Sequence, residues 1–130
     1  MTVRAVVYSD DNSLCRYVAG SLGSTTRLEF VDSYPALLAR MTLGGVALVI
    51  LDGDATPAGG VDVARQLKDR IGDCPPILLV VARAADAWLA LMSRADATIG
   101  PGRDPLSLAA AVSRLTTRPG TRPATSRCRR

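Results

Sequence analysis

The chain has 130 residues, 48% of them hydrophobic, which predicts one folded domain with a buried core. It has no histidine and one lysine, Lys68, which excludes Ser-His-Asp catalysis and histidine metal sites within this chain. The net charge of +4 is uneven, because residues 1–117 carry eleven basic and twelve acidic side chains, whereas residues 118–130 carry five arginines and no acid.

Apolar runs alternate with helical repeats along the chain. In chain order, we expect strands at residues 3–9, 27–31, 46–52, 77–81 and 97–99, and helices at residues 12–22, 34–41, 61–71, 84–94 and 105–116. This alternation predicts a doubly wound α/β fold, with a five-stranded parallel sheet and helices on both faces. The strand order 2-1-3-4-5 is usual at this size. We expect residues 1–117 to form the domain and residues 118–130 a basic, proline-containing, disordered tail.

Carboxylates follow the first and third expected strands directly. Asp10 and Asp11 follow the first, while Asp52 ends the third and Asp54 comes two residues later. In the expected strand order these two strand ends are neighbours, at the switch point where open α/β sheets build ligand sites. Clustered carboxylates repel one another unless a cation joins them, and Mg²⁺ prefers such oxygen ligands. The sequence therefore predicts a magnesium site here.

With these acids in place, the chain resembles a response-regulator receiver domain over residues 3–116. The resemblance rests on the segments SDDNSLCRYVAGSL and LVILDGDATPAGG and on Pro101 after the fifth strand. It implies two-component (phosphorelay) signalling, in which Asp52 accepts a phosphoryl group from a histidine kinase and becomes an aspartyl phosphate. It also implies that Asp10, Asp11, Asp52 and the backbone carbonyl of Asp54 hold Mg²⁺, which neutralises the phosphoryl oxygens.

Two positions depart from the family pattern. Val81 stands where the family has Ser or Thr after the fourth strand, and Gly100 where it has Lys before the proline. Each lost charge-assisted contact is worth about 1.5–3 kcal/mol, whereas a full population switch needs roughly 5.5 kcal/mol. The resemblance thus implies an atypical, stand-alone receiver whose Asp52 can be phosphorylated without switching the fold.

Partner contacts are expected on residues 84–94, which read AADAWLALMSR. This segment is more apolar than one buried stripe requires, so Trp88, Leu91 and Met92 are the candidate contacts with a protein partner or a second copy. In the family, the fourth helix, fifth strand and fifth helix form the usual contact face. The N-terminus meets acids too early for a signal peptide, no apolar run spans a membrane, and the cysteines form no CxxC pair, which favours the cytoplasm.

Two alternatives remain at this stage. The segment DGDAT, residues 52–56, matches the DxDxT signature of haloacid-dehalogenase-type phosphatases, with Asp52 as nucleophile and Asp54 as general acid, but the further lysine and acid pair are missing. The arginines of the tail could bind nucleic acid through its phosphates, but no aromatic side chain is interleaved for base stacking. We expect a signalling module and not an enzyme.

Overall fold

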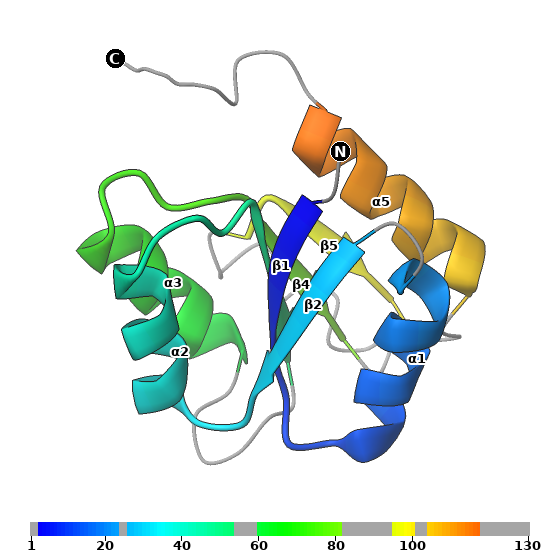
Figure 1. Ribbon diagram of the computed structural model, residues 1–130, viewed down its shortest axis with the longest axis horizontal. Helices are drawn as coiled ribbons and strands as arrows, with labels where there is room; N and C mark the ends of the chain where they lie inside the picture. The colour runs from blue at the N-terminus through cyan, green and yellow to red at the C-terminus, as the bar shows by residue number, and fades with distance from the viewer. Residues whose placement is uncertain (1–2, 24–25, 54–59, 82–94, 101–103, 118–130) are drawn as a thin grey trace.

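The computed structural model describes residues 3–23, 26–53, 60–81, 95–100 and 104–117. These residues form five strands and four helices (Figure 1). The strands are β1 (Val3–Tyr8), β2 (Thr26–Val31), β3 (Leu48–Asp52), β4 (Ile77–Val80) and β5 (Ala97–Ile99). The helices are α1 (Asn12–Leu22), α2 (Tyr34–Thr42), α3 (Gly60–Arg70) and α5 (Pro105–Thr117). The helix expected at residues 84–94 and the tail at 118–130 lie outside the described residues.

The strands form one parallel sheet in the order β2-β1-β3-β4-β5, which confirms the expected topology. Chain order and sheet order differ at β1, which lies between β2 and β3. The carboxyl ends of β1 and β3 are therefore neighbours, and the helices that follow them, α1 and α3, lie on opposite faces of the sheet. This edge carries the acids singled out by the sequence.

Two apolar layers cover the sheet, and Figure 1 shows α1 and α5 on one face and α2 and α3 on the other. Alternate strand residues supply the two layers, as the two-residue period of a strand requires. Val7 and Ile50 pack in the cluster with α1 and α5, whereas Tyr8 and Leu51 pack in the cluster with α2 and α3. Because both faces are buried, the strands read as continuous apolar runs.

The third strand begins at Leu48, two residues later than expected. Gly44 and Gly45 have φ values of 77° and 79°, a left-handed backbone that glycine adopts without strain, and they turn the chain after α2. Pairing of β3 with β1 then starts at Leu48, opposite Ala5. Residues 46–47 are therefore hydrophobic although they precede the strand.

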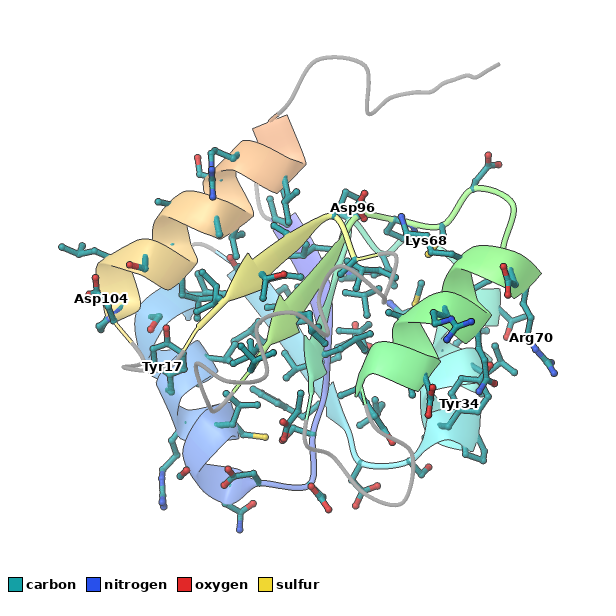
Figure 2. The ribbon with its side chains drawn as sticks, turned by 180° about the vertical axis from the view of Figure 1, so that it is seen from behind. Tyr17, Tyr34, Lys68, Arg70, Asp96 and Asp104 are labelled. Atoms are coloured by element: carbon teal, nitrogen blue, oxygen red, sulfur yellow. The ribbon has the colours of Figure 1, made fainter. Side chains whose placement is uncertain are left out.

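Polar contacts fix the helix ends against the sheet. Tyr17 of α1 donates a hydrogen bond of 2.9 Å to the carbonyl of Asp104, just before α5, and the two residues lie close together in Figure 2. The Asp104 side chain in turn accepts from the backbone N–H of Leu106, which caps α5. No helix within the described ranges is long and apolar enough to cross a membrane.

Candidate functional site

The centre of the site is Asp52, the last residue of β3. The β1–β3 register pairs Tyr8 with Leu51, and its continuation places Ser9 opposite Asp52. The Ser9 hydroxyl donates a hydrogen bond of 2.8 Å to Oδ2 of Asp52, and both residues are buried, with 4% and 7% of their surfaces exposed. A carboxylate removed from water in this way needs hydrogen-bond donors, and Ser9 supplies one.

The two acids after β1 have different roles in the structure. Asp11 is the N-cap of α1, and its Oδ1 accepts from the backbone N–H of Ser13 at 2.9 Å. The backbone N–H of Asp11 donates to the Ser9 hydroxyl at 3.0 Å, which links Asp11 to Asp52 through Ser9. Asp10 is exposed. The structure therefore brings Asp11 and Asp52 to one place and leaves Asp10 at its surface.

Cys15, one turn into α1, faces the same acids. Burial raises the pKa of its thiol, the charges of Asp11 and Asp52 raise it further, and a hydrogen bond with Ser9 acts in the opposite direction. These causes show that the thiol lies within electrostatic reach of both carboxylates. It is held in its neutral form, because a thiolate beside two carboxylates is disfavoured.

Asp11 and Asp52 are described side chains that could bind Mg²⁺. Among the residues that the structure describes, no group of three or more cysteine or acidic side chains is arranged to hold a metal ion. Mg²⁺ in proteins is often bound by one or two carboxylates, with water and phosphate oxygens completing its octahedron. Asp11 and Asp52 offer such oxygen donors, so the chemistry fits Mg²⁺ without an all-protein cage. Asp54 lies outside the described residues.

Val81, the residue after β4, lies next to Gly53, the residue after Asp52. A Cβ added at Gly53 would approach Val80 O at 3.0 Å and Val81 Cγ1 at 3.5 Å, so Gly53 is in close contact with the end of β4. Val81 is 3% exposed and packs in the apolar cluster with α2 and α3. Its branched side chain offers no hydroxyl to a phosphoryl group.

Gly100, which has no side chain, occupies the position where the family has lysine. A Cβ added at Gly100 would meet no atom of the described structure within 4 Å. The one lysine of the chain is elsewhere, because Lys68 Nζ lies 2.8 Å from Oδ2 of Asp96, and the two side chains point toward one another in Figure 2. Asp96 also accepts from the backbone N–H of Ile77, at the amino end of β4 and thus at the opposite edge from Asp52.

The contribution of Ser9 was not foreseen from the sequence. A serine at the end of an apolar run gives no signal of its own, and only the strand register shows that it faces Asp52. The expected partner contacts Trp88, Leu91 and Met92 lie outside the residues that the structure describes, as does Pro101, and they remain predictions.

Known proteins were then compared with this chain. No model of a protein family matches it. Response regulatory proteins from two strains of Mycobacterium tuberculosis are each 39% identical to it over 120 residues, covering 87% of this chain and 90% of the relative.

Solved structures show the same architecture at low identity. The receiver domain of a two-component response regulator from Bacteroides fragilis has a TM-score of 0.81 at 17% identity, covering 91% of this chain and 99% of that chain. The response regulator TrrA from Thermotoga maritima has a TM-score of 0.75 at 20% identity, covering 87% of this chain and 98% of that chain. These likenesses show the fold, and they give no support to the phosphatase alternative. With the identity to the mycobacterial relatives over nearly the whole chain, they show that this protein belongs to the response-regulator receiver family of two-component signalling.

Proposed function

We propose that this protein is an atypical receiver that acts through protein–protein contacts, with Asp52 as its phosphoacceptor. The observation that carries the proposal is the placement of Asp52. It is a buried carboxylate at the carboxyl end of a central strand, with Asp11 and a hydroxyl donor beside it. Open α/β sheets bind ligands at this edge, and a carboxylate there can serve as a nucleophile toward phosphorus.

In the proposed reaction, a carboxylate oxygen of Asp52 attacks the phosphorus of the donor. The bond between phosphorus and the donor's leaving atom breaks, and its electron pair departs with that atom. Acetyl phosphate would release acetate, and a phosphohistidine would release histidine, which takes a proton from water. Asp52 keeps the phosphoryl group as a mixed anhydride, the aspartyl phosphate.

Asp11 and Asp52 are the residues that would hold Mg²⁺, with Asp10 and the carbonyl of Asp54 as the further ligands that the family resemblance implies. The bound ion would neutralise charge on the transferring phosphoryl oxygens. The solved TrrA structure is a complex with Mg²⁺-BeF, which supports Mg²⁺ as the cation proposed here. The protein's own contribution is to place the carboxylates and to exclude bulk water around Asp52.

The proposed output is a contact with another protein and not catalysis. Val81 has no hydroxyl and Gly100 has no side chain, so the phosphoryl group would gain two fewer contacts with which to shift the fold. We propose that a histidine kinase donates the phosphoryl group, and that Trp88, Leu91 and Met92 contribute to the surface for a protein partner or a second copy. We also propose residues 1–117 as the domain, residues 118–130 as a tail without nucleic-acid binding, and a cytoplasmic location.

Intact-protein mass spectrometry tests the proposal directly. The parent protein, Asp52→Asn and the control Asp32→Asn are incubated with Mg²⁺ and acetyl phosphate. Asp32 is exposed just after β2, at the same edge of the sheet, so its variant controls for nonspecific acylation or phosphorylation of surface acids. We expect one added phosphoryl group on the parent and on Asp32→Asn, and none on Asp52→Asn. An unmodified, folded parent would contradict the assignment of Asp52.

A further inference from the structure

The side chain that reaches Asp52 directly comes from position 9. Val7 and Ile50 pack in the cluster on the α1 and α5 face, and strand side chains alternate between faces. Two residues further along each strand, Ser9 and Asp52 therefore point toward the same face, and the register places them side by side. The 2.8 Å hydrogen bond between them follows from this placement.

Hydrogen bonds on both sides hold Ser9 in place. Its backbone N–H donates to the carbonyl of Val31 at 3.1 Å, which extends the pairing of β1 with β2 by one residue. Its hydroxyl oxygen accepts from the backbone N–H of Asp11 at 3.0 Å. A hydroxyl has one hydrogen, and an N–H that occupies a lone pair directs that hydrogen elsewhere. Here it is directed to Oδ2 of Asp52, and the nearby Cys15 thiol, which is neutral, does not compete for it as an anion would.

We propose that Ser9 is a positioning residue for Asp52. It holds the carboxylate in one side-chain orientation, so that the nucleophilic oxygen meets the incoming phosphoryl group at a fixed angle. This inference rests on the proposed role of Asp52 as phosphoacceptor. Phosphoryl transfer depends strongly on alignment, because small misplacements of a reacting group lower the rate by large factors.

A neutral donor suits this position better than a charged one. A hydroxyl at position 9 stabilises the ionised carboxylate without adding a second negative charge beside it. The acids that contribute charge come from the turn after β1, where Asp11 is tied to the start of α1. In this proposal Ser9 orients the nucleophile, and the neighbouring acids attract the cation.

The test compares Ser9→Ala, Ser9→Thr and the control Ser21→Ala. Ser21 is a part-buried serine outside the site, and its hydroxyl donates to the carbonyl of Tyr17 on α1. The rate of phosphoryl gain from acetyl phosphate is followed at increasing Mg²⁺, and the χ1 angle of Asp52 is measured by three-bond NMR couplings. For Ser9→Ala we expect a limiting rate about tenfold lower at saturating Mg²⁺, as is typical when a hydrogen-bond partner of a ligating side chain is removed.

In the alanine variant we also expect averaged χ1 couplings for Asp52, whereas the parent shows one rotamer. Ser9→Thr keeps the hydroxyl and should restore both readings, and Ser21→Ala should change neither. If Ser9 served only to stabilise the fold, the hydroxyl of Ser9→Thr would not restore the phosphorylation rate and the single Asp52 rotamer together. Should Ser9→Ala fail to fold, Ser9→Cys in reductant keeps the side-chain size with a weaker donor and gives the same comparison.

The phosphorylation rate and the Asp52 rotamer together test the phosphoacceptor role of Asp52 separately from the positioning role of Ser9. A parent that gains no phosphoryl group, but whose single Asp52 rotamer is lost in Ser9→Ala, would overturn the phosphoacceptor role and leave the positioning of Asp52 supported. A parent and Ser9→Ala with equal rates and the same single rotamer would overturn the positioning role while Asp52 remained the phosphoacceptor.

Discussion

Replacing Ser9 with aspartate would place a second buried carboxylate directly opposite Asp52. The Ser9 hydroxyl lies 2.8 Å from Asp52 Oδ2, so the added carboxylate would lie about 4 Å from it, where two like charges repel by about 4 kcal/mol at an effective dielectric constant of about 20. The lost hydrogen bond adds about 0.5–1.5 kcal/mol. These amounts are large beside the roughly 5–15 kcal/mol that stabilises a domain.

We expect Ser9→Asp to lower the free energy of unfolding by about 5 kcal/mol when a chelator removes divalent cations. Mg²⁺ should restore much of this loss, because an ion bound only by the folded state at about 100 times its Kd stabilises that state by about 2.7 kcal/mol. Urea denaturation at neutral pH, with chelator and with Mg²⁺, measures both effects.

Ser9→Asn is the matched control, since asparagine has nearly the same shape as aspartate and no charge. It keeps all the proposed Mg²⁺ ligands, so Mg²⁺ should raise its unfolding midpoint no more than it raises that of the parent, and less than it raises that of Ser9→Asp. Equal midpoints for the aspartate and asparagine variants in chelator would refute the reasoning, because they would show that position 9 and Asp52 are not electrostatic neighbours.

Three further predictions concern positions around the sheet. In urea denaturation, Lys68→Met should lower the free energy of unfolding by less than about 1 kcal/mol, because exposed ion pairs contribute little. Asp96→Ala should lower it by about 1–3 kcal/mol, because it also leaves the backbone N–H of Ile77 without its acceptor. Equal losses for the two variants would contradict this difference. Val81→Thr combined with Gly100→Lys should enlarge the chemical-shift changes that follow phosphorylation, since the two side chains supply the hydroxyl and the cation that the family pattern has, and a Cβ at position 100 meets no described atom within 4 Å; unchanged shifts would show that these two side chains do not couple the site to the fold. The raised pKa of Cys15 means that less thiolate is present at a given pH, so its alkylation, mapped by peptide mass, should be slower at pH 8 than in the unfolded chain and should accelerate only at higher pH; an alkylation rate equal to that of the unfolded chain would contradict it.

The sequence predicted the fold and the neighbourhood of Asp52 because hydrophobic periodicity is a local property that survives without tertiary information. Strands buried on both faces appear as apolar runs, and the topology that joins them then follows from few alternatives. The same reasoning found Asp52 at the carboxyl edge and Asp11 at the start of α1, where both lie in the structure.

Hydrophobic periodicity could not predict that Ser9 pairs with Asp52. Which β1 residue faces Asp52 depends on the strand register, and a shift by one residue would have exchanged Ser9 for its neighbours. Cys15 carries no functional signal in the sequence, although its thiol lies near two carboxylates. The start of β3 was misplaced because the turn at Gly44 and Gly45 absorbs residues whose hydrophobicity resembles that of the strand.

The position of Lys68 has a practical consequence for experiments on binding. Because it is the only lysine side chain in the sequence and lies with Asp96 at the amino edge of the sheet, an amine-reactive tag or surface linker on this side chain would attach far from Asp52. Protein immobilised through it would present the edge with Ser9, Asp11 and Asp52 to the solution. Once the α-amino group, which also reacts with such reagents, has been blocked, this single lysine provides an oriented point of attachment for screening candidate partners against the site.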